Sequence, residues 1–223
     1  MRIDAETTVA DRIKITIVYD NDAFRQDLTP DWGFACLVEA HNRQILFDTG
    51  AKREILFANM KALGITVESI DEIFISHFHW DHTGGLAALL AQREIPLCVP
   101  LSYNPPPGAE QVRAVKDPTE IHPGIWSTGE LGGIEQSMVI RKDDCVVVLV
   151  GCSHPGVDII LSTAKHVGRP WALIGGLHEF DRMELLEPIE HICPTHCTQQ
   201  KREIRRRYAE RLIPGGAGKI IEL

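Results

Sequence analysis

The segment that decides the fold is His77-Phe78-His79-Trp80-Asp81-His82, which follows the apolar run Ile73-Phe74-Ile75 after a single residue, Ser76. Four potential metal ligands lie within these six residues. A plain core element would not end in this way, because each imidazole or carboxylate needs a partner, and a divalent cation satisfies them all at once. His77 and His79 point the same way on an extended chain, whereas Asp81 and His82 come one turn later, where a helix starts. The spacing therefore predicts two metal positions about 3.5–4 Å apart, a recurrent hydrolytic arrangement.

The composition is that of a globular enzyme. The chain has 223 residues, of which 44% are hydrophobic and 24% charged, so we expect a packed core and no extensive disorder. The formal net charge of −8 argues against a broad nucleic-acid-binding or membrane-binding surface. No run of 18 apolar residues occurs, and Met1–Asp11 has no apolar signal region. We therefore expect a cytoplasmic protein.

The six cysteines do not indicate a disulfide framework. Most of them lie inside or beside apolar runs, which is typical of reduced, buried thiols. A structural zinc site would need Cys193 and Cys197 to combine with Cys152 and His154. His154 has a better use, described below, so Cys152 and Cys197 are expected to support the metal site from behind its ligands.

Strand-like and helix-like segments alternate along the chain, without a linker or an internal repeat. They predict one domain over residues 1–223, with two sheets packed together and helices outside. The irregular segment 101–124 is expected to form a wall or lid near the site. Strands are expected at residues 13–19, 34–40, 44–47, 70–76, 95–100, 138–141, 145–150, 171–174 and 219–223, and helices at 54–63, 83–93, 157–167, 183–187 and 198–212.

Three further histidines follow predicted strands: His154, His178 and His196. Strand ends are where open sheets usually place their ligands, so these side chains are expected to join residues 77–82. Hydrogen-bonded structural roles are expected for the remaining histidines. These are His41, His122, His166 and His191.

Several motifs resemble the metallo-β-lactamase fold superfamily, notably Leu46-Phe47-Asp48-Thr49-Gly50 and the run from Ser76 to Gly85. The resemblance is closer to one branch, the 7,8-dihydropterin-6-methyl-4-(β-D-ribofuranosyl)-aminobenzene-5′-phosphate synthase-like proteins, and covers about residues 17–198. The motifs that carry it are Asp20-Asn21, Asp31-Trp32-Gly33-Phe34, Thr128-Gly129-Glu130, Glu135-Gln136, Gly151-Cys152-Ser153-His154-Pro155-Gly156, Gly175-Gly176-Leu177-His178 and Pro194-Thr195-His196-Cys197-Thr198.

The resemblance implies an α+β fold, an αββα four-layer sandwich of two mixed sheets flanked by helices. It also implies the site residues. The first metal would be held by His77, His79 and His154, and the second by Asp81, His82 and His196, with Asp48 supporting the histidine loop.

One departure from the superfamily concerns the bridging aspartate that usually follows a strand between the third and the last metal histidine. Here the strand ends in Gly175-Gly176-Leu177-His178, without a carboxylate. His178 would replace one bond of that bridge or contact the substrate. Without a bridging carboxylate the second metal is held less firmly, so we expect unequal affinities of the two positions.

Imidazole and carboxylate ligands suit two divalent ions, with zinc first and manganese or iron as alternatives.

The favoured function is a binuclear hydrolase that uses a metal-activated hydroxide on a small ester, lactone or phosphoester, with Asp81 exchanging the proton. One alternative is a pterin-related synthase that condenses a dihydropterin pyrophosphate with an aminobenzene ribofuranosyl phosphate. The other is a non-enzymatic metal-binding sensor. The partner is expected to be a small molecule that could carry a phosphate, with no membrane and no nucleic acid; the oligomeric state is not predicted.

Overall fold

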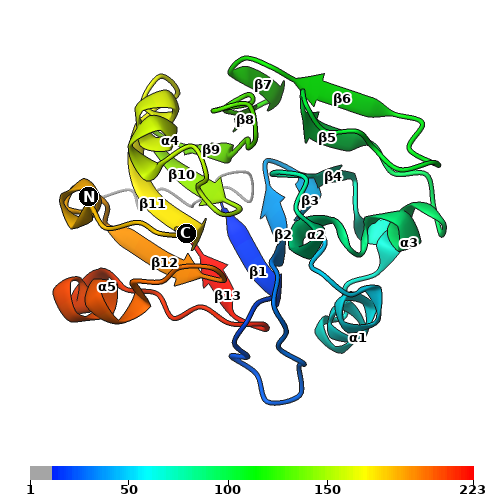
Figure 1. Ribbon diagram of the computed structural model, residues 1–223, viewed down its shortest axis with the longest axis horizontal. Coiled ribbons are helices and arrows are strands. Elements are labelled where there is room, and N and C mark those ends of the chain that lie inside the picture. Colours follow the sequence, from blue (N-terminus) through cyan, green and yellow to red (C-terminus); the bar gives the residue numbers. More distant parts are fainter. Residues whose placement is uncertain (1–11) are drawn as a thin grey trace, which may run out of the picture.

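The computed structural model describes residues 12–223, so the expectation for Met1–Asp11 lies outside the described residues. Its strands form two mixed sheets (Figure 1). In order across the first sheet, the strands are β13 (Ile220–Glu222), β1 (Lys14–Tyr19), β2 (Ala35–Ala40), β3 (Arg43–Phe47), β4 (Glu72–Phe74), β5 (Leu97–Pro100) and β6 (Val112–Val115). The second sheet has the order β12 (His191–Thr195), β11 (Arg169–Gly176), β10 (Cys145–Val150), β9 (Met138–Lys142), β8 (Ile125–Ser127) and β7 (Thr119–His122).

The helices lie outside the two sheets, with α1 and α3 on one side and α4 and α5 on the other (Figure 1). The α-helices are α1 (Arg53–Leu63), α2 (Trp80–Thr83), α3 (Leu86–Leu90), α4 (Val157–Ala164) and α5 (Lys201–Arg207). Short 3-10 helices are η2 (Val67–Ser69), η3 (Met183–Leu186) and η4 (Ala209–Arg211). No helix in the described part of the chain has the length and apolar character that crossing a bilayer requires.

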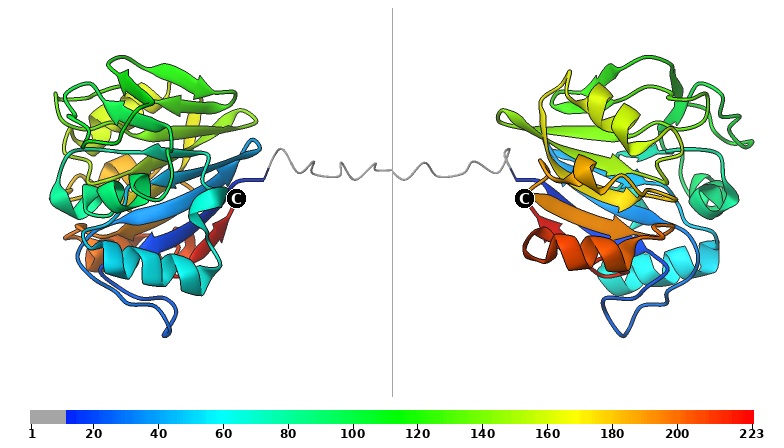
Figure 2. Two further views of the ribbon diagram at one scale, coloured as in Figure 1. Left: turned by 90° about the vertical axis from the view of Figure 1, so that its right-hand side faces the viewer. Right: turned by 60° about the vertical axis from the view of Figure 1, so that its left-hand side comes forward.

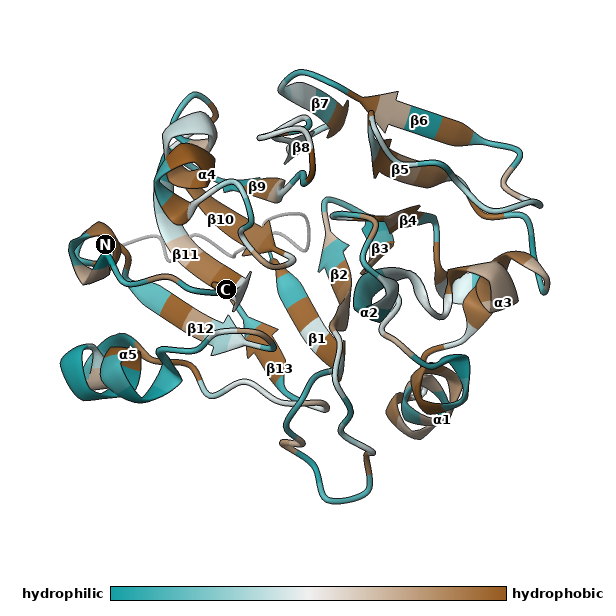
Figure 3. Ribbon diagram, viewed as in Figure 1, coloured by the Kyte–Doolittle hydropathy of each residue, from teal (hydrophilic) through white to brown (hydrophobic). Residues whose placement is uncertain are grey.

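Hydrophobic side chains fill the space between the two sheets and also the space between each sheet and the helices outside it. The sandwich therefore has four layers. In β10, Val147 and Leu149 face the other sheet, whereas Val146, Val148 and Val150 pack under α4 and α5. The same alternation in β2 divides its residues between the central core and the layer under α1 and α3. The strands are buried on both faces, which explains why they are largely hydrophobic in Figure 3. The outer helix α5 is largely hydrophilic in the same view. The predicted αββα sandwich is confirmed.

The ends of the described chain lie side by side. β13 pairs antiparallel with β1, with Ile15 opposite Ile221. Figure 2 shows these two strands side by side in both views. The helix α1 ends as predicted at Gly64, whose φ of 71° is the left-handed conformation that glycine adopts without strain. The predicted helix over residues 198–212 was wrong in extent: it is divided into α5 and η4. The Thr198 hydroxyl accepts a hydrogen bond from the Leu177 backbone N–H at 2.9 Å, which holds the preceding turn to β11.

The irregular segment 101–124 supplies one edge strand of each sheet, β6 in the first and β7 in the second. Its proline-rich part, residues 105–107, has no regular secondary structure. The role of this segment as a wall or lid stays a prediction.

Candidate metal centre

The predicted site residues follow the carboxyl ends of strands in both sheets. Asp48 follows β3, and residues 77–82 follow β4. From the second sheet, His154 follows β10, His178 follows β11 and His196 follows β12. The sandwich therefore brings together residues that lie up to 148 positions apart in the sequence, from Asp48 to His196.

The first set of predicted ligands comes together as expected. One ring nitrogen from each of His77, His79 and His154 lies within 4.8 Å of the others. Nε2 of His77 is only 3.1 Å from Nδ1 of His79. Two ring nitrogens this close require a proton or a cation between or beside them, because their lone pairs would otherwise face each other. This geometry suits a metal ion.

The second set also comes together. Ligand atoms of Asp81, His82 and His196 lie within 4.8 Å of one another, and all three side chains are buried. Asp81 and His82 are in the first turn of α2, which begins directly after His79. The ring centroids of His77 and His82 are 4.1 Å apart, so the two sets are neighbours. Their role as ligands of two ions stays a prediction.

Asp48 supports both sets from beneath. Its carboxylate is fully buried and accepts hydrogen bonds from the Ser76 backbone N–H and hydroxyl, both at 2.7 Å. Nδ1 of His82 is 2.7 Å from the same carboxylate, so Nε2 of His82 is the nitrogen left for a metal. The Ser76 hydroxyl also lies 2.9 Å from Nδ1 of His77, which leaves Nε2 of that ring free. The prediction for Asp48 agrees with this geometry.

Asn21 and Trp32 have supporting roles that the sequence did not reveal. The Asn21 side-chain oxygen lies 2.9 Å from Nδ1 of His196 and directs Nε2 of that ring toward the second set. Trp32 donates its indole N–H to Asp81 Oδ2 at 2.7 Å. Both residues lie in motifs that resemble the synthase-like branch, and that membership was the only signal in the sequence.

Glu135 shapes the loop that carries His154. Its buried carboxylate accepts four backbone N–H groups, from Gly151, Cys152, Ser153 and His154, at 2.9–3.1 Å. Burial raises the pKa of Glu135, and the four hydrogen bonds act in the opposite direction by stabilising the ionised form. The carboxylate thus replaces regular secondary structure in holding residues 151–154.

Unpartnered nitrogens test whether a metal fits this site. Nε2 of His154 and Nε2 of His196 are buried and make no hydrogen bond within the described residues. His196 Nε2 lies 3.3 Å from Asp81 Oδ2, a close approach without hydrogen-bond geometry. Buried polar atoms without partners are costly, and a cation bound at these atoms removes the cost. The donor set of imidazoles and one carboxylate is one that divalent metals accept.

The backbone at the site is strained. Asp48, Ser153, His178 and His196 all have positive φ values, between 42° and 63°. Residues other than glycine in this region cost free energy, and such strain gathers at functional sites. Hydrogen bonds to Asp48 and from the His196 N–H to Asp20 Oδ1, at 2.8 Å, hold two of these residues in place.

Two thiols and His178 form a third cluster beside the two ligand sets. Sγ of Cys152 and Sγ of Cys197 are 3.2 Å apart, and Cys152 Sγ is 3.2 Å from Nε2 of His82. The two thiols share one S–H···S hydrogen bond, in which the Cys197 thiol donates to the Cys152 sulfur. Cys193 lies instead in the core between the sheets, so it does not join a zinc site with the other two.

The histidines of the first set favour the neutral state. Burial lowers the pKa of His77 far below its usual value, and burial with the charges of His79 and His178 lowers the pKa of His154 to about 4. Burial alone would lower the pKa of His82, but the charge and the hydrogen bond of Asp48 outweigh this effect, so the pKa is raised. Burial would raise the pKa of Asp81, yet its close contact with His196 and the charge of His82 lower it well below its usual value. Neutral imidazoles and an ionised carboxylate are the forms that bind metals.

We expect the metal-free protein to lose stability as the pH falls from about 6.5 to about 4. In this range the unfolded chain protonates His77 and His154, whose usual pKa is 6.5, while the folded chain resists protonation down to about 4 at His154. The raised pKa of His82 makes its contribution at and above the usual value of 6.5, so it adds little to the change below that pH. Thermal unfolding of chelator-treated protein against pH measures this effect. A melting temperature that does not change over this range in wild type, or that falls equally in His154→Gln, would contradict it.

The other histidines are away from the two sets, as expected. His41 contacts the Arg141 carbonyl at 2.9 Å, His122 pairs with Glu72 at 2.6 Å, and His166 contacts the Thr163 carbonyl at 3.2 Å. His191 packs edge-on against Trp171.

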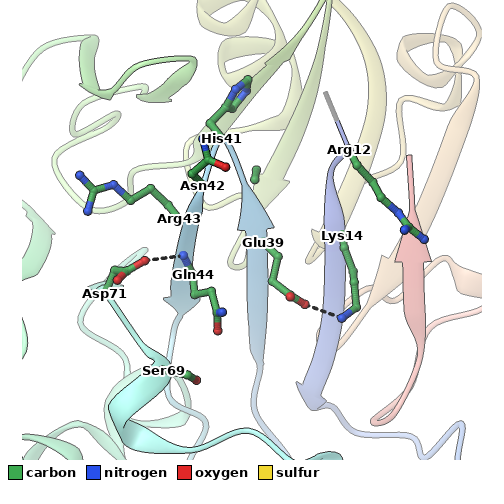
Figure 4. A pocket seen from close by; sticks show the side chains of 10 residues that line it. Arg12, Lys14, Glu39, His41, Asn42, Arg43, Gln44, Ser69 and Asp71 are labelled. Atoms are coloured by element: carbon green, nitrogen blue, oxygen red, sulfur yellow. Dashed lines mark hydrogen bonds and ion pairs between the residues drawn. The ribbon is translucent and has the colours of Figure 1, made fainter. Parts of the chain in front are cut away.

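A recess on the first sheet lies away from the metal ligands (Figure 4). In it Lys14 pairs with Glu39 at 2.6 Å, and the Gln44 N–H donates to Asp71 at 2.8 Å. None of the residues that line it is a predicted ligand. The metal centre therefore remains the candidate functional site.

Comparison with known proteins agrees with this geometry. Residues 28–136 match the family model described as the metallo-beta-lactamase superfamily. A curated relative, the 7,8-dihydropterin-6-methyl-4-(beta-D-ribofuranosyl)-aminobenzene-5′-phosphate synthase of Methanocaldococcus jannaschii, is 27% identical over 95% of this chain and 97% of its own length. A solved structure described as a metal-dependent hydrolase of the beta-lactamase superfamily has a TM-score of 0.76 at 23% identity, covering 95% of this chain and 99% of the other. The metallo-beta-lactamase fold protein YhfI from Bacillus subtilis has a TM-score of 0.66 at 14% identity, covering 96% of this chain and 100% of the other.

The chain thus has the metallo-β-lactamase fold, residues 28–136 match the model of that superfamily, and its clustered side chains form groups that suit a divalent metal ion. Its predicted resemblance to the dihydropterin synthase-like branch is likewise confirmed.

Proposed function

We propose that the protein is a binuclear metal-dependent hydrolase of a small ester or lactone. The observation that carries this proposal is the meeting of two complete ligand sets, His77–His79–His154 and Asp81–His82–His196, with unpartnered ring nitrogens at their centre. When bound, two divalent ions would polarise a carbonyl oxygen and supply a nucleophile from water at neutral pH. Zinc is the ion that this donor set suits first.

The residues of the chain hold the site ready for this chemistry. Asp48 and Asn21 fix the ring orientation of His82 and His196, so neither ring has to reorganise. Trp32 holds Asp81, which stays ionised because its pKa is lowered. Asp81 therefore acts mainly as a ligand, and would accept a proton only transiently.

The surroundings of the centre favour a substrate with an apolar part. Trp32, Phe78 and Trp80 are all at least half exposed, and Trp32 lies 5.1 Å from the His196 ring. Phe78 packs edge-on against His79 at 5.1 Å. Exposed aromatic side chains beside a polar centre can bind an acyl or aromatic group. A cavity of about 270 Å³ reaches the site between His154 and His178, which suits a small molecule.

The charge of this cavity favours a neutral ester or lactone over a phosphoester. Its lining includes Asp158, Glu179 and Asp181 but one arginine, Arg182, which is already paired with Asp158 at 2.8 Å. We expect Glu179→Gln to raise kcat/KM for phosphorylated substrates by about 2- to 5-fold relative to lactones, the size of an exposed charge interaction. Glu187→Gln, an exposed carboxylate outside this cavity, is the matched control. An unchanged ratio in Glu179→Gln would remove the electrostatic argument.

The relative from Methanocaldococcus jannaschii favours a second candidate, a pterin-related synthase. In that reaction a C–N bond forms between the aromatic amine and the pterin methylene, the C–O bond to pyrophosphate breaks, and the amine releases a proton. Two bulky, highly charged substrates fit the small acidic cavity less well than one neutral ester. We therefore keep the hydrolase as the first proposal.

A substrate panel tests these functions together. Elemental analysis of the purified protein is combined with assays on lactones, carboxylic esters, thioesters and phosphodiesters, with and without added Zn²⁺ or Mn²⁺. Pyrophosphate release from a dihydropterin pyrophosphate and an aminobenzene ribofuranosyl phosphate is measured in parallel. Metal-dependent lactone or ester turnover supports the hydrolase. Pyrophosphate release that requires the amine, without ester turnover, replaces it with the synthase, and bound metal without any turnover favours a sensor.

A further inference from the structure

The place of the missing bridging carboxylate is filled in this structure. A side chain added at Gly176 would bring its Cβ to 2.7 Å from Cys197 Sγ and 2.4 Å from the Gly151 carbonyl. At Gly175, the Cβ would lie 2.0 Å from the Val150 carbonyl. An aspartate at the end of β11 therefore cannot be accommodated, and the Cys197 sulfur and the Cys152 backbone lie where its side chain would begin.

Cys152 lies between the two predicted ligand sets. Its sulfur is within 4.8 Å of ligand nitrogens of both His77 and His82, and it also belongs to the cluster with His178 and Cys197. The distance from Cys152 Sγ to Nε2 of His82 is 3.2 Å. Two atoms that bind one tetrahedral zinc ion, at about 2.3 Å for sulfur and 2.0 Å for nitrogen, lie roughly 3.5 Å apart. The observed spacing needs only a small adjustment to fit a shared ion.

We propose that Cys152 supplies a thiolate to the metal centre in place of the bridging carboxylate, and that Cys197 positions it. This inference rests on the proposed binuclear centre. On metal binding, the Cys152 S–H bond breaks, its proton leaves to solvent, and a sulfur–metal bond forms. The thiolate restores the single negative charge that the absent aspartate would have provided, so the second ion is not left short of anionic ligands.

Cys197 is a positioning residue in this arrangement. Its sulfur is 3.2 Å from Cys152 Sγ, so its S–H can donate a hydrogen bond to the bound thiolate. The Cys197 side chain is buried, and the Thr198 hydroxyl anchors its loop through the Leu177 N–H. A donor held in this way orients the ligand without taking a metal bond itself. A thiolate also changes the metal preference, since sulfur favours zinc, cobalt or iron over manganese.

Cobalt substitution of the full chain tests the proposal independently of catalysis. We expect wild-type protein loaded with Co²⁺ to bind two ions and to show a near-ultraviolet charge-transfer band from thiolate to cobalt. Cys152→Ala should lose the band and weaken one site by at least about 10- to 100-fold. Cys152→Asp should regain the second ion without the band. Cys197→Ala should keep the band with about 10-fold weaker binding.

The control is Cys193→Ala, which removes a buried thiol in the core between the sheets and should leave the band unchanged. Two bound ions without the band in wild type would overturn the thiolate proposal while leaving the binuclear centre intact. A band that persists in Cys152→Ala would overturn it as well. Fewer than two ions in wild type would overturn the binuclear centre, and this inference with it. The wild-type spectrum decides even where a variant fails to fold.

Discussion

His79→Ala is expected to lower kcat/KM for the best ester or lactone by about 10³-fold and to remove one of two bound ions. The loss corresponds to about 4 kcal/mol of transition-state stabilisation, the size expected when a metal no longer polarises the substrate. His79 is suitable because its ring is only partly buried, so its removal leaves no large cavity. Among the hydrogen bonds found in residues 12–223, the His79 ring makes a contact only with His77, at 3.1 Å.

The matched control for this prediction is His166→Ala, which removes an exposed histidine after α4 whose ring contacts only the Thr163 carbonyl, at 3.2 Å. Elemental analysis and initial rates are measured on the same preparations, because a loss of activity with full metal content would point to a substrate contact. His79→Ala with both ions and undiminished turnover would exclude His79 from the metal centre. Unfolding by urea shows whether either substitution affects the fold itself.

The sequence was sufficient to predict that these side chains meet, because local order carries most of the information. Their division into two ligand sets was implied by the resemblance to the metallo-β-lactamase fold superfamily and stays a prediction. Residues 77–82 are consecutive, and His154 and His196 each follow an apolar strand. Once strand ends meet at one edge, those side chains must meet as well. The meeting of strand ends needs only the direction of each strand, which hydrophobic patterning provides. The supporting role of Asp48 was instead implied by the family resemblance, and the structure places Asp48 after β3, in contact with Ser76.

The supporting contacts depend on tertiary geometry and could not be predicted in this way. Trp32 and Asp81 are 49 residues apart, and Asn21 and His196 are 175 apart, yet each pair forms a hydrogen bond. Polar side chains in irregular loops have no periodicity that would indicate which partner they reach. Glu135 shows the limit most clearly, since its four partners are all backbone N–H groups. Any loop sequence offers such donors, so nothing in residues 151–154 pointed to Glu135.

The two thiols illustrate a different limit. In the sequence, Cys152 and Cys197 lie next to predicted ligands, but nothing in the sequence indicated that a cysteine itself contacts the metal ions. That reason is the close packing of β10 and β11, which leaves no room for a side chain at Gly175 or Gly176. The close approach of Gly151 and Cys197 to Gly176 excludes an aspartate there and leaves the two thiols beside the ligand sets.

Asp48→Ala is expected to cost about 3–5 kcal/mol of the free energy of unfolding in the metal-free protein. Asp48 and His82 form a fully buried pair, and removing one partner of such a pair leaves the other without compensation. The Ser76 N–H and hydroxyl would also lose their acceptor. Alanine further adds strain, because Asp48 has a φ of 56°, which aspartate and asparagine tolerate better.

Asp48→Asn separates these contributions, since asparagine keeps the shape and the tolerance of positive φ but loses the charge. One amide oxygen can still accept from the Ser76 N–H, whereas the amide nitrogen faces His82 Nδ1 as a donor. We therefore expect Asp48→Asn to retain more stability than Asp48→Ala and yet to bind metal about 10- to 100-fold more weakly than wild type. Urea unfolding of the metal-free proteins and competition with a chelator measure the two effects. Wild-type metal affinity in Asp48→Asn would show that the carboxylate stabilises the fold without orienting His82.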